Sequence, residues 1–88
     1  MNTFKLRITT PSEDCYDADA YQLSVRVTDG DIAIMAGHIP FVTSVVKGQC
    51  AVWLDEDTKK SAVTEGGLLT VGADSVTFLS GSFRFDEQ

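Results

Sequence analysis

Alternation of apolar and polar side chains is the feature that most constrains how this chain folds. Leu23, Val25 and Val27 alternate with Ser24 and Arg26. Successive side chains of a β-strand point to opposite faces, so a period of two predicts a strand with one buried face. The same pattern, or a short apolar run, predicts a short strand near residues 15–16 and others over residues 4–9, 21–28, 32–35, 41–46, 49–54, 59–64, 68–71, 75–80 and 83–85.

Turn residues separate the predicted strands, and no stretch of ten residues has the periodicity of a helix. Gly30, Pro40, Gly66 and Gly67 are assigned to turns, where glycine supplies positive φ and proline interrupts pairing. The strands recur about every 8–12 residues, a spacing typical of a sandwich or barrel. We therefore expect a single domain over residues 1–88, all-β, folded as a two-layer antiparallel β-sandwich of about nine to ten short strands.

Composition and charge limit the classes of partner. The chain has 88 residues, of which 43% are apolar and 23% are charged, so it holds one modest core and is not a disordered segment. The net charge of −6 argues against binding to nucleic acid or to anionic lipid, both of which attract clustered cations. No apolar run approaches the roughly 20 residues that cross a bilayer, and no signal peptide is recognisable. We expect a cytosolic chain, monomeric when isolated, without direct membrane insertion.

No constellation of residues predicts catalysis, a metal site or a cofactor. A metal site needs three or four convergent ligands, whereas the chain offers one histidine, His38, and two cysteines far apart in sequence, Cys15 and Cys50. Serine, histidine and carboxylate are all present, but no spacing or elbow motif joins them into a triad. The acidic run at residues 55–57 is better explained as a solvated hairpin tip than as an acid–base pair. The seven glycines match no phosphate-binding motif.

Residues 29–40 form the segment of the sequence that most strongly suggests a binding site. Turn residues stand at both ends of a short apolar strand, with Asp31 and His38 beside the two turns. Loops held by a rigid scaffold are where binding residues collect. The residues alone leave open whether this segment is a docking site or simply a pair of turns. Asp31 and His38 are the candidate partner-binding residues.

The same segment carries a family resemblance. Residues 30–40, GDIAIMAGHIP, resemble the signature of the epsilon subunit of the F-type ATP synthase, usually Gly-Glu-x-Gly-x-x-Pro-x-His-x-Pro. Asp31 stands where that family has Glu, Ala33 where it has Gly, and Ala36 where it has Pro. The resemblance extends over nearly the whole chain, through FKLRITTPSEDCYDADAYQLSVRV, FVTSVVKGQCAVW and EGGLLTVGADSVTFLS. The two C-terminal helices of the family have no counterpart in these residues, so their inhibitory and nucleotide-sensing roles are not carried over.

The resemblance implies a non-catalytic, central-stalk rotor component that links the gamma subunit to the c ring and couples proton translocation to ATP synthesis. Its location would be the cytoplasmic face of a bacterial inner membrane, through the ATP synthase complex. Asp31 and His38 would lie at the end that faces the c ring. Trp53 and Leu79, each out of phase with its apolar neighbour, are candidates for an outer face that contacts gamma. The alternative is a stand-alone β-sandwich that binds a protein or ligand, which predicts a concave apolar pocket.

Overall fold

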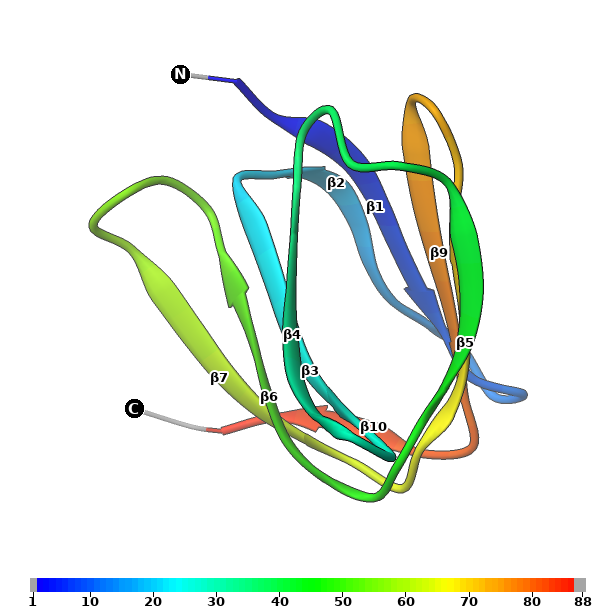
Figure 1. Ribbon diagram of the computed structural model, residues 1–88. Helices are drawn as coiled ribbons and strands as arrows, with labels where there is room; N and C mark the ends of the chain where they lie inside the picture. Colours follow the sequence, from blue (N-terminus) through cyan, green and yellow to red (C-terminus); the bar gives the residue numbers. More distant parts are fainter. Residues whose placement is uncertain (1, 87–88) are drawn as a thin grey trace.

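The structure is a computed structural model, and it describes residues 2–86, which contain β-strands and no helix. Figure 1 shows the strands wrapped around a common interior. The prediction of an all-β chain is therefore confirmed. The strands are β1 (Phe4–Thr9), β2 (Asp14–Ala20), β3 (Gln22–Val27), β4 (Gly30–Met35), β5 (Phe41–Val45), β6 (Gly48–Trp53), β7 (Lys59–Thr64), β8 (Gly67–Val71), β9 (Ser75–Ser80) and β10 (Phe83–Phe85).

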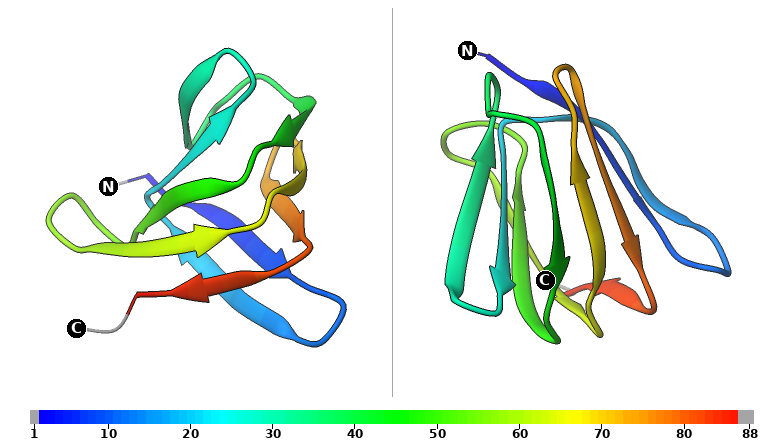
Figure 2. Two further views of the ribbon diagram at one scale, coloured as in Figure 1. Left: turned by 90° about the horizontal axis from the view of Figure 1, so that it is seen from below. Right: turned by 45° about the vertical axis from the view of Figure 1, so that its right-hand side comes forward.

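Two sheets of five strands make the sandwich. Sheet A has the order β2-β1-β9-β8-β5, and sheet B has the order β10-β7-β6-β3-β4. The two layers are visible in Figure 2. One pair departs from the antiparallel pattern, because β1 and β9 run parallel, with Lys5 opposite Ser75 and Thr9 opposite Leu79. Strands joined by a tight turn are antiparallel, whereas β1 and β9 are distant in sequence and can meet in either direction.

Strand β2 is longer than the short strand predicted near residues 15–16. It pairs with β1 along its whole length, with a register shift between Ile8 and Thr9. Asp17 and Asp19 are exposed on it, because β2 is an edge strand of sheet A. Charged side chains on an edge strand oppose pairing with another chain. Those same charges interrupt the apolar alternation from which a strand is recognised.

The inward positions of both sheets fill one core. The residues that alternate with polar neighbours in the sequence are those that become inaccessible to solvent. Sheet A and sheet B contribute similar aliphatic and aromatic side chains, which pack into a single cluster. Those without measurable exposure include Leu6, Ile8, Leu69 and Phe78 from sheet A and Leu23, Ile34, Val52 and Ala62 from sheet B. The outward positions are thereby left for contacts with other molecules.

The turn between β7 and β8 requires glycine because other backbone passes close to it. Gly66 has φ of +99°, and a Cβ there would lie 2.6 Å from the carbonyl oxygen of Val45. A Cβ on Gly67 would overlap the carbonyl oxygen of Leu79. Backbone atoms cannot move aside as the end of a flexible side chain can. The two glycines therefore allow β8 to approach both β5 and β9.

A buried polar network joins the two sheets beside this turn. The Thr64 and Ser80 hydroxyl oxygens are 2.7 Å apart, and the Gly66 N–H donates to Thr64 Oγ1 at 2.9 Å. Ser80 also donates to the carbonyl oxygen of Ser82 at 2.7 Å. Within residues 2–86, no buried side-chain nitrogen or oxygen lacks a hydrogen-bond partner. The network thus links β7 of sheet B to β9 of sheet A without an unsatisfied group.

Candidate docking surfaces

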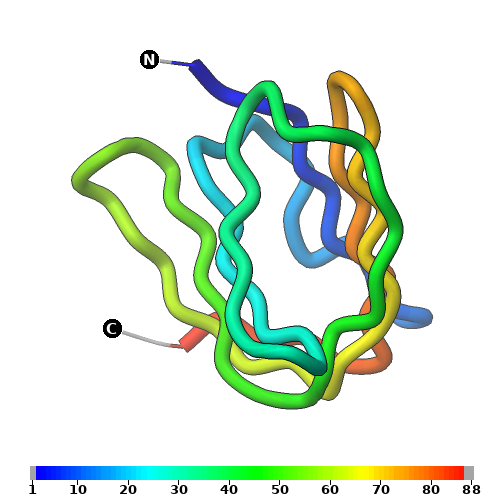
Figure 3. Tube along the Cα trace, in the orientation of Figure 1, coloured from blue at the N-terminus to red at the C-terminus, as the bar shows by residue number. Residues whose placement is uncertain are grey.

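Asp31 and His38 lie at opposite ends of β4. Asp31 is the second residue of this strand, beside the β3–β4 turn, and His38 follows the other end. An antiparallel strand of this length extends about 20 Å. In Figure 3 the β3–β4 turn is at the bottom of the trace and the connection from β4 to β5 is at the top. The expectation that both residues face one end is therefore wrong, because the whole length of β4 separates them.

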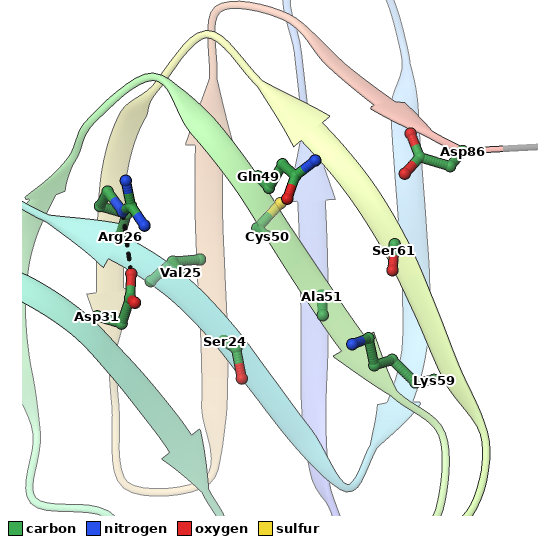
Figure 4. Close-up of a pocket in the computed structure, with 10 residues that line it drawn as sticks. All are labelled: Ser24, Val25, Arg26, Asp31, Gln49, Cys50, Ala51, Lys59, Ser61 and Asp86. Carbon is green, nitrogen blue, oxygen red and sulfur yellow. Dashed lines mark hydrogen bonds and ion pairs between the residues drawn. The ribbon is translucent and has the colours of Figure 1, made fainter.

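The Asp31 carboxylate already has a cationic partner in this chain. Asp31 is directly opposite Arg26 across the β3–β4 hairpin, and Arg26 Nε donates to Asp31 Oδ1 at 3.1 Å. The two side chains are 61% and 71% exposed, and they lie together on the outer face of sheet B (Figure 4). Arg26 was not among the residues predicted from the sequence to lie at a binding site. A two-residue turn at Thr28 and Asp29 would have predicted this pair, because it places residues 26 and 31 opposite each other.

His38 lies in an exposed loop that leads into β5. Its ring centroid is 5.1 Å from that of Phe41, and its Nδ1 is 3.0 Å from the carbonyl oxygen of Ile39. The backbone N–H of His38 donates to the carbonyl oxygen of Met35 at 3.3 Å, and this bond holds the loop against the end of β4. Ile39 is 78% exposed. The loop therefore presents an imidazole and an apolar side chain to solvent at one end of the sandwich.

Three large apolar side chains are exposed on neighbouring strands of sheet A. Leu68 on β8 is directly opposite Leu79 on β9, and Val42 on β5 projects from the same side of the sheet. Their exposures are 42%, 48% and 61% respectively. Isolated exposed hydrophobic residues are ordinary, but adjacent ones indicate a surface that contacts another molecule. We call Val42, Leu68 and Leu79 the apolar face.

The other half of sheet A's outer surface is charged. Lys5 Nζ lies 3.9 Å from Asp17 Oδ1, and Arg7 Nη2 lies 3.2 Å from Asp14 Oδ1, both across the β1–β2 hairpin. A hydrogen bond from Thr9, and then the Arg7 guanidinium, hold the pKa of Asp14 below its ordinary value. Exposed pairs like these add little stability but keep this half of the surface polar. The apolar face is thus confined to β5, β8 and β9.

The outer face of sheet B differs in its side chains. Trp53 is directly opposite Lys59, whose Nζ is 5.6 Å from the ring centroid. Ser24, Ala51 and Ser61 form an adjacent cross-strand row of small residues. Trp53 and Leu79 therefore lie on opposite outer faces of the sandwich. The expectation that both belong to one gamma-facing surface is wrong, since alternation separates inward from outward positions without saying which layer a strand joins.

The row of small residues forms the floor of an open depression of about 420 Å³ on sheet B (Figure 4). Its lining is somewhat more polar than apolar, and its Arg26 and Asp31 are already paired with each other. A stand-alone binding module was expected to have a concave apolar pocket with convergent polar groups. This depression is polar and open, so it does not match that expectation.

Among the described residues, the buried Cys50 thiol is not a reactive nucleophile. Burial, and then the nearby Asp86, raise the pKa of the Cys50 thiol to about 11, so it stays protonated at neutral pH and is a poor nucleophile. Between residues 2 and 86, no three His, Cys, Asp or Glu side chains are close enough to hold a metal ion. In the same part of the chain, no helix has the length and hydrophobicity needed to cross a bilayer.

The chain is similar in sequence to proteins of a known family. Residues 3–85 match the family model described as the ATP synthase delta/epsilon chain, beta-sandwich domain. The ATP synthase epsilon chain of Bacillus velezensis is 42% identical over 80 residues, which cover 91% of this chain and 60% of the relative. That of Ruminococcus albus is 33% identical over 89 residues, covering 100% of this chain and 66% of the relative. The chain thus spans less than two thirds of the length of these relatives.

A solved structure shares the fold. A chain in the cryo-EM structure of the Euglena gracilis mitochondrial ATP synthase, in an assembly that includes the c ring, superposes with a TM-score of 0.88 at 20% sequence identity. The superposition covers 94% of this chain and 53% of that one. Taken with the family match over residues 3–85, these relatives show that the chain belongs to the ATP synthase delta/epsilon family, whose β-sandwich domain it forms.

Proposed function

We propose that the chain is a central-stalk rotor component of an F-type ATP synthase, joining the gamma subunit to the c ring. In this role it helps to couple proton translocation to ATP synthesis and catalyses no reaction itself. The observation that carries the proposal is the apolar face, which gives a member of the epsilon-chain family a surface suited to a permanent partner. A closed two-sheet core adds stiffness, which a part that transmits rotation needs.

The gamma subunit is the partner proposed for the apolar face. Val42 lies on β5, and the loop that carries His38 and Ile39 leads directly into this strand. A surface that combines the apolar face with Ile39 would have an apolar centre and a polar margin, as protein interfaces generally do. Because β4 separates His38 from Asp31, we assign His38 to the gamma contact and not to the c ring.

The c ring is the partner proposed for the end of the sandwich that holds the β3–β4 turn and Asp31. This end is reached by three short connections, β3–β4, β5–β6 and β7–β8, which Figure 1 shows together at the bottom of the molecule. Through the ring, the chain would be held at the cytoplasmic face of a bacterial inner membrane. We propose that the isolated chain is monomeric, because its acidic β2 edge opposes pairing between copies.

Calorimetric titration of the chain with purified gamma subunit at moderate salt tests the proposal. We expect tight one-to-one binding with a negative heat-capacity change, since burying apolar surface has that signature. Circular dichroism of the same sample checks that the chain is folded. A folded chain that binds no gamma subunit would overturn the proposal and favour the stand-alone binding module.

A further inference from the structure

The four edge strands of the sandwich differ in how well they are protected against pairing with another strand. Strand β2 carries three aspartates, β4 carries Asp31, and β10 has only three residues, one of them Arg84. Charge and short length both discourage strand pairing at an edge. Strand β5, with the sequence FVTSV, has neither protection, and Pro40 stands before its first residue and not within it. Among the edges that the structure describes, β5 is therefore the most open to an added strand.

The backbone groups of Val42 and Ser44 point to the free side of β5. A Cβ on Gly66, just before β8, would lie 2.6 Å from the Val45 carbonyl oxygen, so the Val45 backbone faces β8. The next residue, Val46, faces the other way, because its N–H donates to a carbonyl oxygen of β3 at 2.9 Å. Backbone groups alternate in direction along an antiparallel strand, so Val42 and Ser44 face away from β8 as Val46 does.

These two residues present backbone donors and acceptors that no other strand of the described chain uses. Strand β5 pairs with β8 alone, and no backbone hydrogen bond from a turn or loop of residues 2–86 reaches Val42 or Ser44. The Ser44 carbonyl oxygen accepts only a long bond, 3.5 Å, from the Thr43 hydroxyl. An extended backbone is the group that satisfies such a row of N–H and C=O groups. The chemistry of this edge thus specifies a β-strand as its occupant.

We propose that an extended, uncharged segment of the gamma subunit adds to β5 as a further strand of sheet A. This assignment rests on the proposed function, in which the apolar face meets gamma. Val42 belongs both to that face and to the free edge, so a strand beside β5 would continue the surface of Leu68 and Leu79. The inner side of the added strand would cover Phe41 and Thr43, which are half-buried in the chain alone. The segment is uncharged because β5 offers no charged side chain to pair with one.

A proline substitution tests the backbone contact separately from the side chains. Ser44→Pro removes the N–H on the free side and leaves the pairing with β8 intact, because proline is accepted on an edge strand where its N–H would face solvent. Ser44→Ala is the matched control, since it removes the same hydroxyl but keeps the N–H. Thermal unfolding checks that both variants are folded, and calorimetry at moderate salt measures their affinity for purified gamma subunit.

We expect Ser44→Pro to weaken gamma binding about tenfold or more, because the proline ring removes a donor and blocks the approach of the added strand. Ser44→Ala should bind within about twofold of the unsubstituted chain, since its backbone groups are unchanged. Equal binding by the two variants would overturn the strand addition and leave the proposed gamma contact in place. If the unsubstituted chain does not bind gamma, the proposed function fails and this assignment fails with it.

Amide hydrogen exchange, measured residue by residue by NMR, gives a second readout that needs no substitution. In the free chain, the amides of Val42 and Ser44 should exchange faster than those of Thr43 and Val45, which face β8. Bound gamma should slow exchange at Val42 and Ser44 by about tenfold or more. Binding without this protection would contradict the strand addition even if Ser44→Pro does not fold. Protection that instead rises with the concentration of the chain alone would assign the edge to a second copy and overturn the proposal.

Discussion

The outer faces of the two sheets are made by the same alternation and yet present different surfaces. On sheet A, Leu68 and Leu79 are exposed side by side. On sheet B, the strand registers place the row of small residues between the Trp53–Lys59 pair and the Arg26–Asp31 pair. The inward positions of both sheets are similarly apolar, because both fill one core. The outward side chains therefore determine which partners each face can bind, because folding constrains them less than it constrains the inward side chains.

The largest expected effect comes from a change that disrupts sheet A alone. Gly67→Ala would place a Cβ against the carbonyl oxygen of Leu79 and force β8 away from β9. We expect a loss of more than about 2 kcal/mol in the free energy of unfolding, measured by thermal or urea denaturation. Gly81→Ala is the matched control, because nothing lies within 4 Å of a Cβ at that position. Equal stability of the two variants would show that the close approach of β8 and β9 is not required.

The comparison of faces predicts which substitutions affect gamma binding. Leu79→Asp places a charge in the apolar face, and we expect gamma binding to weaken more than tenfold in calorimetry, as for a central contact of an interface. Trp53→Ser, on the other face, should leave gamma binding unchanged. If Trp53→Ser weakens binding and Leu79→Asp does not, the gamma contact belongs to sheet B.

A third change tests the link between the sheets. Thr64→Val keeps the shape of the side chain but removes the acceptor of the Gly66 N–H and the partner of the Ser80 hydroxyl. We expect a destabilisation of about 1–3 kcal/mol in thermal or urea unfolding, the usual penalty for leaving a buried polar group unsatisfied. Gamma binding by the folded fraction should be unchanged, because Thr64 is buried away from both outer faces. Unaltered stability would mean that the network does not contribute to holding the layers together.

The smallest expected effect is on acid stability, with one carboxylate for each sheet. The pKa of Asp14 in sheet A is lowered by Thr9 and Arg7, and the pKa of Asp55, which follows β6 of sheet B, is lowered by hydrogen bonds from Asp57 and Thr58. A lowered pKa in the folded chain stabilises it above the ordinary value of 3.8, and this stability is lost as the pH falls through the lowered pKa.

Thermal unfolding measured from pH 5 to pH 2 should show this loss. Asp55→Asn should make the midpoint less sensitive to pH over that range, and a control change at the neighbouring Glu56 should not. An identical pH dependence in the Asp55→Asn variant and the unsubstituted chain would mean that the Asp55 hydrogen bonds add nothing to stability.

Alternation predicted most strands, because it records directly which side of a strand is buried. The strand expected over residues 21–28 is β3, Gln22–Val27. What alternation does not contain is the choice of partner strand, so the parallel pairing of β1 with β9 was not predicted. Trp53 and Leu79 were both correctly placed outward, but the sheet that each joins depends on the topology of distant strands.

The candidate site was predictable only in part. Position beside a turn was enough to select Asp31 and His38, and each does lie beside one. Their separation follows from the length of β4, which a local motif does not express. The partner of Asp31 could have been predicted from the sequence, because a two-residue turn places Arg26 directly opposite it. Only tertiary structure could show that Val42 belongs with Leu68 and Leu79.

The parallel pairing of β1 with β9 also determines the order in which the strands can pair during biosynthesis. The hairpins β3–β4 and β6–β7 of sheet B join strands that leave the ribosome close together. In sheet A, β1 and its hairpin partner β2 must wait for β9 before they join β8 and β5. Pairing between distant segments is slow, because a long loop must close first. A nascent chain therefore lacks the paired surface of Leu68 and Leu79 until almost all of the sandwich has been translated.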